Sequence, residues 1–227
     1  HGYIAFSRHS LDLAAVTHNV MNGYSDRINH ALAFAAKHHD QRVRRGTKPP
    51  YSTQPANVGI ILTRYGYDDD TVTAGILLEV VEDYGREASS PELLQTRIGE
   101  KFGTRALEIA LMVAERRSDD DGLELSADER RDDVLRRLGS ASPEGQVLAT
   151  ADALHNAGTL LADLRRTVDV HAVWARVPGG RIRTLETHQR FQERLDDCGF
   201  RAPILDELRE TVSALAGIPG GAGSAAT

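Results

Sequence analysis

The feature that most constrains the fold of this chain is a nearly continuous apolar run at residues 72–81, VTAGILLEVV. Ten residues are too many for a usual strand, so the run predicts a helix. Asp68, Asp69 and Asp70 stand immediately before it and are candidate N-caps. A helix that is apolar on nearly every side is a core helix. The run therefore predicts a buried helix at the centre of the domain.

Helical patterns and caps recur along the rest of the chain. Val58, Ile61, Leu62 and Tyr65 follow the helical period from about residue 55. Further helices are predicted before residue 40 and at residues 91–103, 107–114, 126–138, 143–161, 184–197 and 203–216. No stretch alternates apolar and polar residues, so we expect an all-α fold. The expected divisions are an N-terminal extension at 1–20, one domain at 21–216 and a disordered tail at 217–227.

Composition excludes several classes of protein. The chain has 227 residues, enough for one full domain, and a net charge of −6, which disfavours nucleic acid and anionic membranes as partners. Its single cysteine, Cys198, rules out a disulfide framework. No apolar run approaches the roughly 20 residues of a membrane span. We expect a cytoplasmic protein whose partner is a small molecule, with its oligomeric state left open.

Three carboxylates interrupt the core helix. Glu79, Glu82 and Asp83 lie at positions i, i+3 and i+4, so they share one face. Like charges on a core helix are unfavourable unless a cation or a proton compensates them. A solvated helix end explains the pattern as well as a reactive cluster does.

Two other segments carry unusual polar residues. Asp152 and His155 lie one turn apart on a predicted helix that is otherwise small or apolar, where a structural pairing is the simpler explanation. Residues 42–51, RVRRGTKPPY, form a basic loop whose arginines and lysine suit phosphate oxygens, although most short charged loops are merely solvated.

Taken together and in order, these segments resemble a known family. Residues 39–55, HDQRVRRGTKPPYSTQP, are similar to its H-x-G-Q-x-R-K-G-T-x-x-P-Y-x-x-H-P loop. Residues 74–83 (AGILLEVVED), 100–103 (EKFG) and 151–156 (ADALHN) resemble its A-A-L-L-H-D-V-V-E-D, E-x-F-G and A-D-[RK]-L-H-N motifs. The family is the HD-domain metal-dependent phosphohydrolase superfamily, on the branch of bacterial alarmone (guanosine tetra- and pentaphosphate) hydrolases. The resemblance implies a single HD-domain helical bundle.

The resemblance also implies a metal site, usually for manganese, but the ligand positions have changed. They are occupied here by Gln54, Leu78, Glu79 and Asp152, so both family histidines are missing. Leucine cannot ligate an ion, and the loss of two imidazoles removes the nitrogen donors that hold transition metals. We therefore predict no metal cofactor. A weak site for a divalent cation at Glu79 and Asp152 is the alternative.

Other family positions are retained, which suggests that the pocket survives without its metal chemistry. The expected catalytic residues are Glu79, Glu82, Asp83 and Asp152. The expected substrate-binding residues are Arg44, Arg45, Lys48, Tyr51, Gln54, His155 and Asn156. Three functions fit: a metal-independent enzyme doing acid–base chemistry on a small metabolite, a non-catalytic nucleotide or metabolite binder, and a residual phosphohydrolase with a weak cation site.

Overall fold

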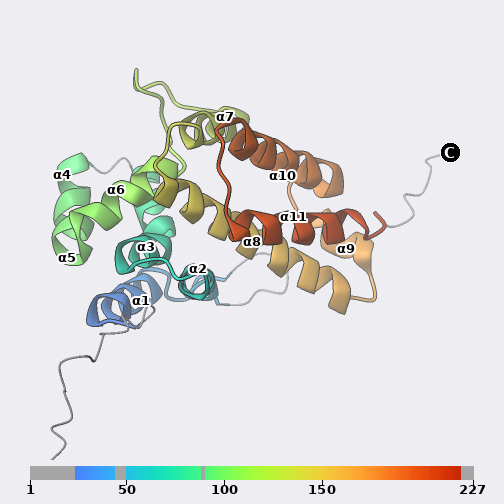
Figure 1. Ribbon diagram of the computed structural model, residues 1–227, viewed down its shortest axis with the longest axis horizontal. Helices are drawn as coiled ribbons and strands as arrows, with labels where there is room; N and C mark the ends of the chain where they lie inside the picture. The colour runs from blue at the N-terminus through green and yellow to red at the C-terminus, as the bar shows by residue number, and fades with distance from the viewer. Residues whose placement is uncertain (1–23, 44–49, 88–89, 221–227) are drawn as a thin grey trace, which may run out of the picture.

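The computed structural model describes residues 24–43, 50–87 and 90–220, and its secondary structure there is helical (Figure 1). Its elements are α1 (Asp26–His38), α2 (Thr53–Arg64), α3 (Asp69–Arg86), α4 (Pro91–Leu94), a π-helical turn η2 (Gln95–Gly99), α5 (Glu100–Phe102), α6 (Thr104–Val113), α7 (Ala127–Leu138), α8 (Pro143–Arg166), α9 (Val170–Ala175), α10 (Gly180–Asp197) and α11 (Pro203–Ala216). Two isolated antiparallel bridges are the only β pairing in these ranges. The predicted all-α fold is confirmed.

Helix α3 is the central element, as its apolar sequence predicts. The Asp68 side chain caps its first turn by accepting the Thr71 N–H at 2.9 Å. Its apolar residues are buried on all sides by α1, α2, α6 and α8. Such all-round burial explains why this helix, unlike a surface helix, lacks a polar face over residues 71–78.

Two glycines allow α2 and α3 to approach closely. A Cβ on Gly75 would lie 2.5 Å from a methyl group of Leu62, and a Cβ on Gly59 would lie 3.0 Å from the Ile76 side chain. Larger residues at these points would push the helices apart. This contact brings the first turn of α2 alongside the carboxylate-bearing end of α3.

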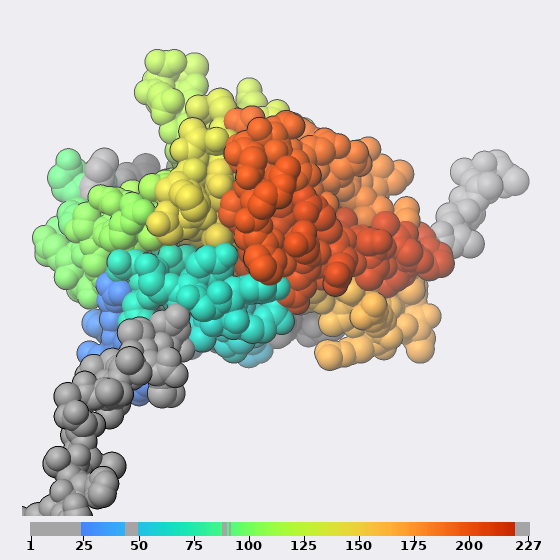
Figure 2. All heavy atoms as spheres, viewed as in Figure 1, coloured from blue at the N-terminus to red at the C-terminus, as the bar shows by residue number. Residues whose placement is uncertain are grey.

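Helix α8 joins the two ends of the molecule. It contacts α2, α3 and α6 on one side and α11 on another, while α10 packs on α7 and α11. Figure 1 shows α1 to α6 gathered at one end and α9 to α11 at the other. Figure 2 shows the orange and red C-terminal part of the chain packed against the teal and yellow segments.

Several predicted boundaries differ from the structure. Helix α2 begins at Thr53 rather than near Pro55, because proline is tolerated in a first helical turn. Helix α10 begins at Gly180 rather than residue 184, after Gly179 adopts a left-handed φ of 78°. The predicted helix 91–103 is interrupted by η2, and the short α9 was not predicted. The capping box of Ser126 and Glu129 is confirmed.

Parts of the predicted domain limits lie outside the described residues. These are the proposed extension 1–20 and residues 221–227 of the proposed tail. None of the described helices combines the length and the apolar character needed to traverse a bilayer.

Candidate active site

The predicted carboxylate face of α3 does not point into solvent. The side chains of Glu79, Glu82 and Asp83 are only 16%, 16% and 12% exposed. Arg86 follows them one turn later on the same face, with its guanidinium nitrogens 2.5 Å from Asp83, 3.7 Å from Glu82 and 3.9 Å from Glu79. The solvated-end interpretation is therefore wrong, and Arg86 is the cation that compensates the cluster.

Gln54 joins two of the predicted site residues. Its buried Nε2 donates to Glu79 Oε1 at 2.7 Å and to Asp152 Oδ1 at 2.9 Å. Carboxylate oxygens accept hydrogen bonds, so the NH₂ end of the amide faces them. Gln54 thus holds α2, α3 and α8 together at the point where three helices meet.

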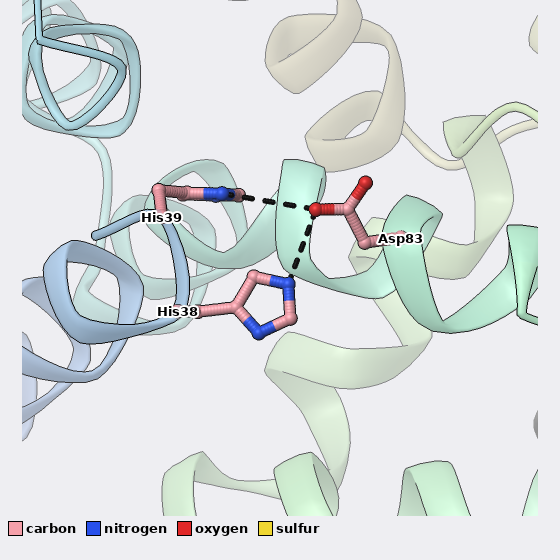
Figure 3. A group of neighbouring side chains, drawn as sticks. All are labelled: His38, His39 and Asp83. Atoms are coloured by element: carbon pink, nitrogen blue, oxygen red, sulfur yellow. Dashed lines mark hydrogen bonds and ion pairs between the residues drawn. The ribbon is translucent and has the colours of Figure 1, made fainter. Parts of the chain in front are cut away.

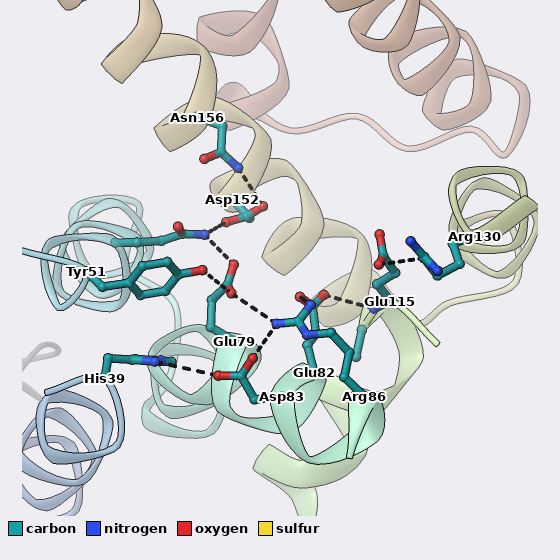
Figure 4. Close-up of polar contacts among 12 residues, drawn as sticks. His39, Tyr51, Glu79, Glu82, Asp83, Arg86, Glu115, Arg130, Asp152 and Asn156 are labelled. Carbon is teal, nitrogen blue, oxygen red and sulfur yellow. Dashed lines mark hydrogen bonds and ion pairs between the residues drawn. The ribbon is translucent and has the colours of Figure 1, made fainter. Parts of the chain in front are cut away.

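Tyr51 and Asn156 add two hydrogen bonds to this group (Figure 4). The Tyr51 hydroxyl donates to Glu79 Oε2 at 2.6 Å, and Asn156 Nδ2 donates to Asp152 Oδ2 at 2.9 Å. Burial, together with the Glu79 charge, raises the pKa of Tyr51, so its hydroxyl keeps its proton. Tyr51, Gln54 and Asn156 thus hold the two carboxylates through neutral donors, while Arg86 lies 3.9 Å from Glu79.

Asp83 belongs to a separate ion-pair cluster (Figure 3). His38 Nε2 lies 3.1 Å and His39 Nδ1 3.7 Å from Asp83 Oδ2, and Arg42 also donates to this oxygen. Burial alone would raise the pKa of Asp83, but hydrogen bonds from Arg86 and Arg42 outweigh it and hold that pKa below its usual range. With both oxygens engaged, Asp83 is placed to anchor the end of α1 to α3, and its catalytic role stays a prediction.

The two histidines and Asp83 have the spacing of a metal site, since their ligand atoms all lie within 4.8 Å of one another. Two guanidinium groups already bind the one carboxylate of this group. A divalent cation would have to displace them against their charge. The cluster is accounted for by its ion pairs.

Glu82 has a different environment from its neighbours. One of its oxygens accepts the backbone N–H of Glu115 at 2.9 Å. Burial, reinforced by the charges of Glu79 and Asp152, raises the pKa of Glu82 to about 8, against the opposing effects of the Glu115 N–H and Arg86. Glu82 is therefore a carboxylic acid that carries its proton near neutral pH.

Glu82 and Asp152 line a cavity of about 420 Å³ between α3, α7, α8 and α10. Its apolar wall is formed by Leu78, Val113, Val134, Leu135, Ala149, Ala153 and Phe191. Its polar wall adds Glu115, Arg131, Asn156, Thr187, His188 and Arg190. This volume and mixed lining are those of a small-molecule site.

The structure thus brings together Tyr51, Gln54, Glu79, Glu82, Asp152 and Asn156 from the predicted set. His155 is buried on α8. Arg44, Arg45 and Lys48 lie outside the described residues.

Sequence reasoning missed several contributors to the site. Arg86 had a signal, because it continues the i, i+3, i+4 spacing to i+7. His188 had none, since α10 reaches the cavity only through tertiary packing.

The residues at the family's metal positions do not fit a metal ion. Leu78 is a buried hydrocarbon, and Gln54 turns its amide protons, not its carbonyl oxygen, toward the two carboxylates. An ion between Glu79 and Asp152 would meet these protons. The Gln54 amide group therefore lies between Glu79 and Asp152, in the place where a bridging cation would have to bind.

The model of the family described as "HD domain" matches residues 31–181 of the chain. This match spans more than half of the sequence, and the chain belongs to the HD-domain family. No curated protein matches it significantly.

Two solved structures share the fold. One is lmo0812 from Listeria monocytogenes EGD-e, with 24% identity and a TM-score of 0.57, covering 74% of this chain and 99% of that one. The other is a metazoan ortholog of SpoT, described as hydrolysing ppGpp and playing a role in starvation responses. It has 22% identity and a TM-score of 0.62, covering 86% of this chain and 98% of that one. The expected likeness to alarmone hydrolases is confirmed at the level of fold.

Proposed function

We propose that this chain is a metal-independent enzyme that carries out proton transfer on a small metabolite, with Glu82 as its general acid. The observation that carries this proposal is the place of Glu82: a largely buried, protonated carboxylic acid, with its side chain 16% exposed, on the wall of a ligand-sized cavity. A general acid works best when its pKa lies near the working pH. Hydrolysis of ppGpp, described for the metazoan relative, is not carried over, because the metal positions have lost both imidazoles.

The surrounding residues have supporting roles in this proposal. Glu79 and Asp152 are held by Gln54, Tyr51 and Asn156, and their charges keep the pKa of Glu82 raised. The Glu115 N–H fixes one Glu82 oxygen and leaves the other directed to Arg86 or to a ligand. Glu79 and Asp152 are thus positioning residues, and Glu82 is the group that meets the substrate.

The test is a turnover screen of a metabolite mixture by mass spectrometry, with a chelator present. Wild type and Glu82→Gln are compared, with Glu87→Gln as a control for an exposed carboxylate at the end of the same helix. We expect turnover that survives the chelator and falls about a hundredfold or more in Glu82→Gln only.

Two results would overturn the proposal. Turnover that requires an added divalent cation would favour a residual phosphohydrolase. Ligand binding without turnover would favour the binding-protein alternative.

A further inference from the structure

A second titratable side chain faces the same cavity as Glu82 and is not used above. His188, on α10, is half-buried and lines the 420 Å³ cavity. It also lines an adjoining hollow of about 330 Å³, which it shares with Asn156, Leu160 and Val173. The imidazole makes no hydrogen bond to any other residue in the described part of the chain. A half-buried polar ring left without a partner is available to a ligand.

The two arginines that line the cavity with His188 are each paired with an aspartate. Arg131 is bound to Asp128, and Arg190 to Asp132 at 2.7 Å. These pairs leave little net positive charge on this wall, which disfavours a phosphoryl group as the reacting centre. A neutral or singly charged reacting group suits the cavity better.

We infer that His188 is the second catalytic residue of this cavity, the general base that complements the acid Glu82. The inference rests on the proposed function. Glu82 comes from α3 and His188 from α10, so the two groups reach a bound molecule from different walls. Burial lowers the pKa of His188, which keeps its ring neutral and able to accept a proton. Opposite shifts of two groups in one site are typical of an acid–base pair.

This pair defines a class of substrate: a small carbon acid, with a C–H bond next to a carbonyl. His188 removes the proton, and the electron pair of the broken C–H bond forms a carbon–carbon double bond. The π pair of the carbonyl then takes the proton of Glu82, giving an enol. When His188 returns its proton to a carbon of the enol, the enol O–H gives its proton back to Glu82 and the carbonyl reforms. Both side chains are then regenerated, so no further reactant is needed.

The test uses a chromogenic probe, 5-nitrobenzisoxazole, with the full chain. A base removes its ring C–H proton, the N–O bond breaks, and the oxygen leaves as a phenolate that an acid stabilises. We expect wild type to exceed free imidazole at equal concentration. His188→Gln should lower kcat/KM about tenfold or more, whereas His171→Gln, an exposed histidine on α9, should not change it.

The remaining measurements distinguish a catalytic His188 from a structural one. Imidazole added to His188→Ala should restore the rate, which would not happen if His188 were merely structural. A wild-type rate in His188→Gln, or a loss that imidazole does not rescue, overturns the role of His188. Glu82→Gln is measured in parallel: if it alone is impaired, the proposed function stands without His188, and if neither is impaired, both proposals fail.

Discussion

Replacing Gln54 by leucine tests whether its amide holds the carboxylates together. Leucine has a similar size, so the change removes hydrogen bonds without opening a large cavity. The two oxygens that share the Gln54 Nε2 lie within 5.6 Å of each other, the sum of the distances 2.7 and 2.9 Å. Without the amide, Glu79 and Asp152 face each other across an apolar side chain.

The magnitude follows from two effects. A hydrogen bond to a charged group contributes about 1.5–3 kcal/mol, and two are lost. Two like charges about 5 Å apart repel by about 3 kcal/mol at an effective dielectric constant of about 20, which the amide dipole partly offsets in wild type. Water entry relieves part of this repulsion, so we expect a loss of about 3–5 kcal/mol in the free energy of unfolding.

Urea unfolding followed by circular dichroism measures this loss. With a slope of about 2 kcal/mol per molar urea, the midpoint should fall by about 1.5–2.5 M. The control is Gln189→Leu on the exposed surface of α10, which should change stability by less than about 0.5 kcal/mol. A similarly small effect for Gln54→Leu would refute the bridging role of the amide.

Three further predictions concern the same site. Glu82→Gln keeps an acceptor for the Glu115 N–H but cannot ionise. Because the folded pKa of Glu82 lies above its unfolded value of 4.5, wild type loses stability as the pH rises from 4.5 to about 8. The free energy of unfolding of the variant should lack this loss, so the variant should become more stable relative to wild type between pH 4.5 and about 8. If urea unfolding gave parallel pH profiles for the two proteins, the raised pKa of Glu82 would be contradicted. Asp83→Asn should instead cost about 3 kcal/mol, because Arg42 loses its carboxylate partner and Arg86 loses the nearest of its three; an unchanged melting temperature would show that the ion pairs contribute nothing. The triple change Gln54→His, Leu78→His and Glu79→Asp restores two imidazoles and should bind one manganese ion per chain in calorimetry, whereas wild type should bind none; stoichiometric binding by wild type would overturn this.

Much of the architecture follows from local sequence signals. The predicted limits of α11 coincide with the observed Pro203–Ala216, because proline at the first position and glycine after the last define both ends. The loss of the metal ligands was also readable, since Leu78 has no ligand atom in any fold. That Glu79, Glu82 and Asp83 share a face is equally a property of helical geometry.

The roles of these carboxylates were decided only by the tertiary structure. Their spacing is the same whether they face water, a ligand or another helix. The close approach of α2 and α3 at Gly59 and Gly75 places the Gln54 amide on Glu79, while Asp152 comes to the same amide from α8. Asp83 became an anchor because Arg42, far away in the sequence, folds back onto it.

The cavity, like the roles of the carboxylates, was decided only by the tertiary structure. His188 is separated from Glu82 by more than a hundred residues, and its α10 carries no sequence signal of a site. Local sequence sets which residues a helix presents on each face, because that depends only on its own period. Which of those faces meet depends on how all the helices pack, and packing sets the burial and charge environment from which Glu82 and His188 acquire their opposite pKa shifts.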